Sequence, residues 1–301
     1  MSKIVELYHN LIRRYWEIGV ASFSEDVINE NHPLDIRWIR NPFENESWFA
    51  DPFILLENED EFVILVEEFP FTTAKGRISR LIVSKSEWQI TDVKVLLELD
   101  THLSFPCYFR REGKVYIYPE NSASGTSTIY VYDERKEELS PIGTLNENPL
   151  TDAVIYDIEG CKFVLSTQHP RENKNQLDVY RLDGLKSEST PCQTITFTEN
   201  IARNAGISFL AKGKLIRPAQ ISNHGYGEGL VLQEVEYTAG KFEFTNLRRL
   251  YSPLHKCPLA FHTMNVFEDR YIIYDAQGYK HPVLGPMVES VATFTKNILK
   301  K

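Results

Sequence analysis

The stretch WFADPFILLENEDEFVILVEEFP, residues 48–70, decides the fold. Two apolar runs flank an acidic turn, and each run has the length of a β-strand, which is the pattern of a β-hairpin. Asp51 stands at the front of the first run and is followed by a proline. An aspartate in this place either caps a turn or faces a site.

The hairpin pattern occurs five times along the chain. The five copies are FADPFILLENEDEFVILVEE from residue 49, SFPCYFRREGKVYIYPEN from residue 104, LTDAVIYDIEGCKFVLSTQ from residue 150, NAGISFLAKGKLIRPAQ from residue 204 and FHTMNVFEDRYIIYDAQG from residue 261. Further strands are expected at 76–84, 127–133, 176–182 and 229–237. Four strands per unit, repeated about every forty to fifty residues, are typical of β-propeller blades.

The sequence therefore predicts an all-β fold, a five-bladed β-propeller that forms one domain over residues 1–301. The blades are expected at roughly 48–100, 101–149, 150–200, 201–255 and 256–285, with the N-terminal segment closing the last blade. Short helices are predicted at both ends. IVELYHNLIRRYWEIGV (residues 4–20) has apolar residues close to helical spacing, and residues 286–301 open with a proline and end in lysines. We expect both to be packing or closure elements; membrane docking through Arg13, Arg14 and Trp16 is the alternative.

Composition excludes several classes of partner. Lys and Arg number 33 against 42 Asp and Glu, a formal charge of −9, which argues against binding to nucleic acid or to an anionic membrane. The four cysteines form no C-x-x-C pair, so a zinc site is not expected. No signal peptide is predicted, and no apolar run reaches the roughly 18 residues of a membrane span. We therefore expect a cytoplasmic protein.

Several polar residues occupy corresponding positions in the repeats. Because a propeller brings the starts of its innermost strands together at a central channel, we expect these residues to converge there. Those at the strand starts are Asp51, Asp152 and His262, and those at the ends of the paired strands are Glu67, Glu68, Glu120, Gln220 and Asp275. The cations nearby are Lys75, Arg77, Arg203 and Arg217.

Paired carboxyl groups suit glycosyl chemistry, in which one protonates the leaving oxygen and the other activates water. Asp51 is the predicted general base, Glu120 the general acid, and Asp152 a partner that tunes a pKa or binds sugar. The predicted substrate-binding residues are Glu67, Glu68, Lys75, Arg77, Arg217, Gln220 and His262.

Structural roles remain open for several of these residues. Asp51 could cap a turn, and His262 could be a buried, internally bonded histidine. Only one of Glu67 and Glu68 can point inward, because neighbouring side chains in a strand take opposite faces. No spacing is diagnostic of a metal site, and we expect neither a metal nor a cofactor. The motifs of α/β-hydrolases, P-loop enzymes, zincins and dinucleotide enzymes are missing from the sequence.

WFADPF, VEEFP…KGRIS, LSFPCYFRREGKVYIYPENSASGTSTIYVY, DAVIYDIEGCKFVLST and IRPAQ…YG occur in that order. Together they resemble the propeller domain at the N-terminus of plant glucosamine inositolphosphorylceramide transferases, over about residues 13–279. Bacterial homologues of that domain stand alone or are fused to other sugar-modifying domains, and a bacterial source is expected. The chain is more distantly similar to the five-bladed hydrolases of glycoside hydrolase family 43.

The resemblance implies a five-bladed propeller that works on carbohydrate. The base aspartate of family 43 enzymes is matched by Asp51, and a second aspartate by Asp152. Their acid glutamate sits in a Glu-Gly-Pro-like context that this chain lacks, so Glu120 in YPENSA takes that role by position. In the plant proteins the transferase chemistry is attributed to a separate downstream domain.

The expected function is that of a carbohydrate-active propeller, glycosidase-like or related to sugar transfer, in polysaccharide or glycoconjugate metabolism. The expected ligand is a carbohydrate or a sugar-nucleotide-derived group. The alternative is a non-catalytic glycan-binding or scaffold module that works with a glycosyltransferase. A third hypothesis is a glycosyltransferase in its own right, in which Lys75, Arg77 and Arg217 meet a phosphate.

Overall fold

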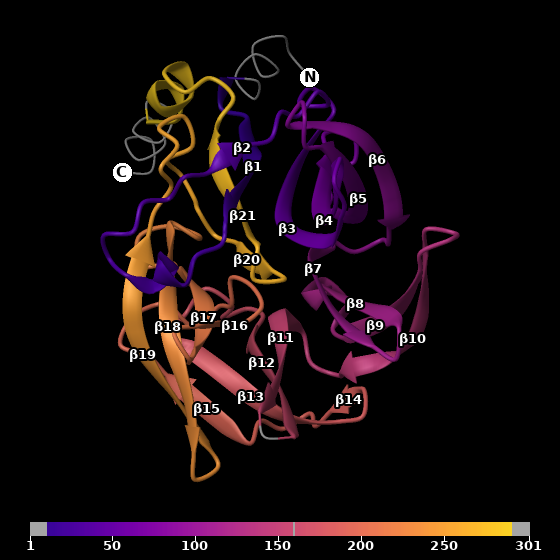
Figure 1. The fold of residues 1–301 in the computed structure, drawn as a ribbon, viewed down its shortest axis with the longest axis vertical. Helices are drawn as coiled ribbons and strands as arrows, with labels where there is room; N and C mark the ends of the chain where they lie inside the picture. Colours follow the sequence, from indigo (N-terminus) through magenta and orange to yellow (C-terminus); the bar gives the residue numbers. More distant parts are fainter. Residues whose placement is uncertain (1–10, 159, 291–301) are drawn as a thin grey trace, which may run out of the picture.

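Five β-sheets are arranged in a ring in the computed structural model, which describes residues 11–158 and 160–290 (Figure 1). Each sheet has its first strand near the centre of the ring and its last strand at the rim. The predicted fold class, an all-β five-bladed propeller, is confirmed. No helix within the described ranges is long and apolar enough to cross a membrane.

Four of the five blades are continuous in sequence. The first contains β3 (Ser47–Glu57), β4 (Glu61–Pro70), β5 (Arg77–Ser84) and β6 (Gln89–Leu97), and the second contains β7 (Ser104–Arg111), β8 (Lys114–Glu120), β9 (Ser127–Asp133) and β10 (Glu138–Asn146). The third contains β11 (Leu150–Ile158), β12 (Cys161–Gln168) and β13 (Gln176–Asp183), with β14 (Lys186–Ser187) and β15 (Gln193–Thr196) both paired to β13. The fourth contains β16 (Phe209–Ala211), β17 (Lys214–Ile221), β18 (Gly229–Thr238) and β19 (Lys241–Leu250). Two 3₁₀ turns, η1 (Glu25–Ile28) and η2 (Ser122–Ser124), lie in connections.

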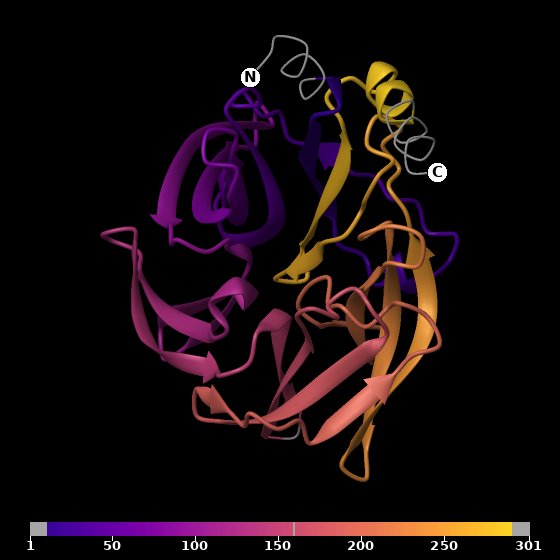
Figure 2. The ribbon, with the colours of Figure 1, turned by 180° about the vertical axis from the view of Figure 1, so that it is seen from behind.

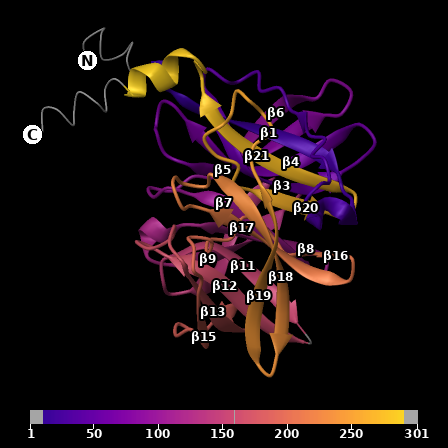
Figure 3. The same ribbon diagram turned by 90° about the vertical axis from the view of Figure 1, so that its left-hand side faces the viewer.

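The fifth blade is built from both ends of the chain. Its inner strands are β20 (Met264–Phe267) and β21 (Tyr271–Tyr279), and its outer strands are β1 (Arg14–Ser22) and β2 (Arg37–Trp38). Strand β1 pairs antiparallel with β21 along its whole length, with Ile18 opposite Asp275. The pairing is visible from behind in Figure 2 and edge-on in Figure 3. Hydrogen bonds between the two ends of the chain therefore close the ring.

The prediction of an N-terminal helix is wrong for residues 14–20, which form most of β1. Trp16 is buried between the more exposed Tyr15 and Glu17, and the run from Ile18 to Ala21 is buried on both faces, as in a strand enclosed by its neighbours. Pairing with β21, some 250 positions away in the chain, overrides the local helical spacing. Residues 4–10 of the predicted segment lie outside the described residues. At the other end, residues 284–290 are helical, and the rest of the predicted C-terminal helix also lies outside the described residues.

A bulge recurs near the start of the innermost strand in the first three blades. There Asp51, Phe105 and Asp152 have φ angles of 50°, 43° and 47°, and the ladder register shifts by one residue around each. Positive φ is uncommon outside glycine, and a bulge of this kind re-aims a side chain. Pro52 and Pro106 follow two of these residues, because a bulge is one of the few places in a sheet that tolerates proline. The repeated sequence pattern thus encodes the same bulge in three blades. The bulge places Asp51 and Asp152 in the polar clusters described below, and it places Phe105 in the apolar packing between blades.

Apolar side chains fill the space between neighbouring blades. Phe53 of the first blade packs edge-to-face on Phe105 of the second, with ring centroids 5.1 Å apart. Phe163 and Phe242 make the same contact, also at 5.1 Å, between the third and fourth blades. All four rings are buried, and each contributes about 1.5–3 kcal/mol from burial. The first contact fixes the innermost strands β3 and β7 relative to each other, and the second holds β12 against β19.

Candidate active site

Asp51 lies at the seam between the first and fifth blades and is almost fully buried. Its Oδ2 atom accepts a hydrogen bond from the backbone N–H of Phe105 at 3.0 Å. Its Oδ1 atom accepts one from the Thr263 hydroxyl at 2.8 Å and faces Nε2 of His262 at 3.5 Å. The carboxylate therefore joins three blades through one side chain.

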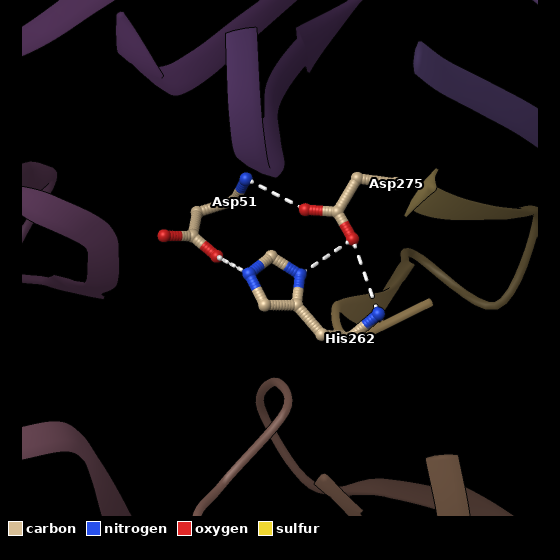
Figure 4. Close-up of side chains that lie close together, drawn as sticks. All are labelled: Asp51, His262 and Asp275. Atoms are coloured by element: carbon tan, nitrogen blue, oxygen red, sulfur yellow. Dashed lines mark hydrogen bonds and ion pairs between the residues drawn. The ribbon is translucent and has the colours of Figure 1, made fainter. Parts of the chain in front are cut away.

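Asp275, on β21, holds the other side of His262. Its Oδ1 atom lies 2.8 Å from Nδ1 of His262 and accepts the backbone N–H of Thr263 at 3.0 Å. Its Oδ2 atom accepts the backbone N–H of Asp51 at 2.9 Å. Figure 4 shows the imidazole ring between the two carboxylates, with the second Asp51 oxygen pointing away from it.

The charges of this trio are set by burial and mutual attraction. Burial alone lowers the pKa of His262, but the carboxylates of Asp275 and Asp51 outweigh it and raise that pKa to about 9. Burial raises the pKa of Asp51 to about 7, although His262 pulls it down. At neutral pH His262 is thus an imidazolium that donates to Asp275 and forms an ion pair with Asp51.

The ligand atoms of Asp51, His262 and Asp275 lie within 4.8 Å of one another, close enough to be considered as a metal site. The two ring nitrogens of His262, however, face two different carboxylates. A metal ion would need one neutral ring nitrogen directed at the same point as both carboxylates. The geometry fits a chain of ion pairs better than a metal centre.

A second cluster gathers around Arg203, which is nine-tenths buried. Its Nε donates to Asp152 Oδ2 at 2.5 Å, and its Nη2 donates to Asp152 Oδ1 at 3.2 Å and to Glu120 Oε2 at 3.2 Å. The Gln220 amide donates to Asp152 Oδ2 at 2.9 Å. The structure thus brings together Glu120, Asp152 and Gln220, three of the residues expected at the channel.

Glu120 differs from Asp152 in its electrostatics. Burial raises the pKa of Glu120 well above its usual range, against the opposing effect of Arg203 and with a further upward contribution from Asp152. Asp152 instead receives both charge-assisted bonds of a side-on guanidinium contact. One carboxyl group of the cluster therefore tends to hold a proton while its neighbour is compensated by a cation.

Tyr226 joins the two clusters at the surface. Its ring lies 5.3 Å from Arg203 Cζ and 5.3 Å, edge-on, from the His262 ring, and the residue is 43% exposed. Beneath it, Trp16 stacks on His262 with ring centroids 4.2 Å apart. An exposed tyrosine over buried acids and cations is a surface on which a sugar ring could stack.

The other predicted site residues have different surroundings. Glu67 is the inward-facing member of its pair and lies 3.2 Å from Nε2 of His102. Glu68 forms a two-pronged ion pair with Arg77, at 3.0 and 2.9 Å, and also accepts from two serines. Lys75 bonds the backbone carbonyl of residue 99.

Arg217 is fully buried within the fourth blade. It donates to Asn204 Oδ1 at 2.8 Å and to Gln233 Oε1 at 2.5 Å. The structure thus keeps Glu68, Lys75, Arg77 and Arg217 in contacts outside the two clusters, and their substrate-binding roles stay predictions.

Three residues of the site were given no role by sequence reasoning. Arg203 and Asp275 were expected near the channel without a function, and Thr263 was not singled out. For Arg203 and Thr263 a signal existed, because both adjoin the start of a repeat. The orientation of these side chains depends on contacts between blades, which the spacing of residues in the sequence does not predict.

Known structures define the class of protein to which this fold belongs. The chain is similar to CoXyl43, a GH43 β-xylosidase/α-arabinofuranosidase from a compost microbial metagenome, with a TM-score of 0.53 and 10% identity over 76% of this chain and 85% of that one. It is also similar to RS223-β-xylosidase, with a TM-score of 0.53 and 12% identity over 79% and 94%. At these identities the likeness shows the fold alone, that of the propellers of glycoside hydrolase family 43.

The sequence places the chain more narrowly. Residues 37–256 match the model of the family described as glucosamine inositolphosphorylceramide transferase 1, N-terminal, and the chain belongs to this family. The predicted resemblance is thereby confirmed. Glucosamine inositolphosphorylceramide transferase 1 of Oryza sativa subsp. japonica is 25% identical over 199 residues, and that of Arabidopsis thaliana 23%. The matched region is 63% of this chain, which spans about a quarter (26%) of the length of these plant relatives. A bacterial source stays a prediction.

Proposed function

We propose that the chain is a carbohydrate-active propeller in which Asp51 acts as general base and Glu120 as general acid of an inverting, glycosidase-like reaction. The supporting observation is the pair of enclosed carboxyl groups with different neighbours: Asp51 beside His262, and Glu120 beside Arg203. Burial raises the pKa of Asp51 to about 7 and that of Glu120 well above its usual range. A carboxyl group with a raised pKa can take or give a proton near neutral pH.

The hydrogen bonds of Asp51 and Glu120 leave both carboxyl groups able to take part in proton transfer. A carboxylate oxygen has two lone pairs, and among the described residues Asp51 Oδ2 accepts only the Phe105 N–H. That oxygen points away from His262 and is free to orient a water molecule (Figure 4). The Glu120 side chain is 12% exposed, and its Oε1 atom accepts a bond from the Ser122 hydroxyl at 3.0 Å while Oε2 faces Arg203. Each oxygen has a second lone pair or position for a proton. Arg203 holds Asp152 beside it as the predicted tuning partner.

The same proposal includes a partner protein, a metabolic role and a cellular location. The named relatives are transferases of which this chain spans about a quarter, which favours work alongside a glycosyltransferase. We place that work in polysaccharide or glycoconjugate metabolism in the cytoplasm, on a carbohydrate or a sugar-nucleotide-derived group.

A non-catalytic glycan-binding module is the second candidate. The observation in its favour is that Asp152 is occupied by internal partners, two bonds from Arg203 and one from Gln220. Such a network shapes a rigid surface without needing to react. The two candidates differ in turnover and not in binding.

Aryl-glycoside hydrolysis by Asp51→Asn and Glu120→Gln variants tests the proposal. Each substitution should lower kcat by about a hundredfold or more, because each removes a proton-transfer group. Asp157→Asn is the matched control, since Asp157 is an exposed aspartate at the far end of the innermost strand of the third blade and should leave turnover intact. Equal turnover in both site variants and the wild type would exclude the assignment. Sugar binding in calorimetry with no turnover by the wild type would select the binding module.

A further inference from the structure

A cavity of about 290 Å³ lies on the rim side of the candidate site, between the fifth and first blades. Its walls come from β1, from the segment that follows β2, and from the start of β3, which lie side by side in Figure 1. Three of the four tryptophans of the chain, Trp16, Trp38 and Trp48, line it. Indole rings offer flat apolar faces on which pyranose rings can stack.

The cavity is connected to the candidate site through shared side chains. Trp16 lines the cavity and also stacks on His262, which contacts Asp51. Trp48 lies 6.3 Å from Trp16, three residues before Asp51, and stacks on Phe69 with ring centroids 4.6 Å apart. A ligand that extends outward from the channel would meet this aromatic wall first.

Positive charge gathers around the cavity although the chain as a whole is acidic. A smaller cavity of about 150 Å³ shares several of its walls and adds Arg13 and Lys280. Arg13 packs on the ring of Phe71, and Lys280 bonds the side-chain oxygen of Asn45. Arg40 is exposed on the wall of the larger cavity.

None of these three cations has a carboxylate partner within residues 11–158 and 160–290. Lys256 is paired with Glu17 at 2.5 Å. Glu44, on the same walls, has no cationic partner in that part of the chain. Over the two cavities together, the three unpaired cations outnumber Glu44, and the excess of positive charge comes from Arg13 and Lys280 on the smaller cavity.

We propose that this groove, defined by Trp16, Trp38, Trp48 and Arg40, is a second sugar subsite that takes a pyranose bearing a negatively charged group, a carboxylate or a phosphate. The inference rests on the proposed function, because it extends the same glycan from the channel to the rim. The tryptophans stack on the ring, and Arg40 pairs with the anionic substituent. A guanidinium suits this role because its fork matches both carboxylate and phosphate.

Fluorescence titration tests the subsite, since three of the four tryptophans report on it. Uronic acids and hexose phosphates of gluco, galacto and manno configuration are titrated beside the neutral methyl glycosides. Either anionic series should quench the emission, and the series that does so identifies the substituent. Arg40→Gln should weaken that binding about tenfold, the loss of one charge-assisted hydrogen bond, and leave neutral sugars unaffected.

Arg135→Gln is the matched control, since Arg135 is an exposed arginine in the β9–β10 turn. Arg40 pairs with the first blade through its backbone, in hydrogen bonds with Trp88 and Ile90, so Arg40→Gln should fold. Lys280→Gln is a second variant with the same expected direction. The proposal is overturned if anionic and neutral sugars bind equally, if no anionic sugar quenches, or if Arg40→Gln behaves like Arg135→Gln. Asp51→Asn should keep the anionic-sugar quench while losing turnover, which separates failure of the subsite from failure of the proposed reaction.

Discussion

The His262 imidazolium makes the stability of the fold depend on pH in a defined window. Its pKa is raised from 6.5 to about 9 because it lies between Asp275 and Asp51. A group with a raised folded-state pKa contributes stability that is fully present below its unfolded pKa and is lost as pH rises through the folded one. At about 1.36 kcal/mol per pH unit, the contribution of His262 is about 3 kcal/mol. We therefore expect the free energy of unfolding to fall between pH 6.5 and pH 9.

The protonation of Asp51 changes the free energy of unfolding over a lower pH range. Burial raises its pKa from 3.8 to about 7, so the folded state binds more protons than the unfolded state between these values. Stability then falls as pH rises through that range as well, and the change is nearly complete about one unit above the folded-state pKa. Measurements from about pH 8 upward therefore isolate His262. For a domain of this size, the loss corresponds to a decrease in Tm of about 5–10 °C.

Thermal unfolding followed by tryptophan fluorescence at pH 7, 8, 9 and 10 provides the assay, because Trp16 stacks on His262. The wild type should show the decrease, and a His262→Gln variant should show a flatter profile because its side chain does not titrate. His102→Gln is the control, since the pKa of His102 is also raised, by Glu67, but its side chain is 45% exposed. An identical slope in the wild type and His262→Gln would refute the reasoning.

Two further predictions concern stability. Arg203→Ala should destabilise the fold by about 3–5 kcal/mol in urea denaturation, because it leaves two buried carboxyl groups without their cation, and Arg203→Lys should recover part of the loss. A loss under 1 kcal/mol for Arg203→Ala would contradict the ion-pair geometry. Gly206→Ala should cost about 2 kcal/mol or more, because its Cβ would lie 2.0 Å from a backbone carbonyl oxygen. Gly143→Ala, with nothing within 4 Å of the added methyl, should be near neutral, and equal melting temperatures for the two glycine variants would disprove the steric argument.

The architecture was predictable from the sequence because each blade is mainly local. A hairpin encodes its own register in a turn and two alternating strands, and five copies make the pattern hard to miss. The strand at residues 14–20 could not be predicted because its pairing is not local. Their partner strand β21 lies at the other end of the chain, so nothing near them in sequence distinguishes a strand from a helix.

Part of the site was predictable for the same reason. Asp51 and Asp152 stand at matching bulges, and a repeat that recurs with an acid at the same place marks it without a structure. Strand alternation also carries information about Arg217 and Gln220. They are three residues apart on one strand and must face opposite sides, so only one of them can reach Asp152. It is Gln220 that does so.

Which cation compensates the channel acids could not be read from the sequence. Arg203 precedes the fourth repeat, whereas Arg217 lies inside it, and spacing alone favours neither. The choice is made by the packing of the fourth blade against the third, which brings the guanidinium of Arg203 onto Asp152. Arg217 is left to bond Asn204 and backbone carbonyl groups within its own blade.

Ring closure and the candidate site share the same residues, which gives a physical reason for burying so many charges there. The chain runs from β2 into β3, so the ring is held without a covalent bond only where β1 pairs with β21. Next to this pairing, Asp51 of the first blade meets His262 and Asp275 of the fifth. Opening this seam would break the ion pairs that raise the pKa of His262, and it would also remove Trp16 from the His262 ring. A ligand bound across the seam would therefore stabilise the closed ring by the free energy of its own binding, so that folding and function are coupled at one place.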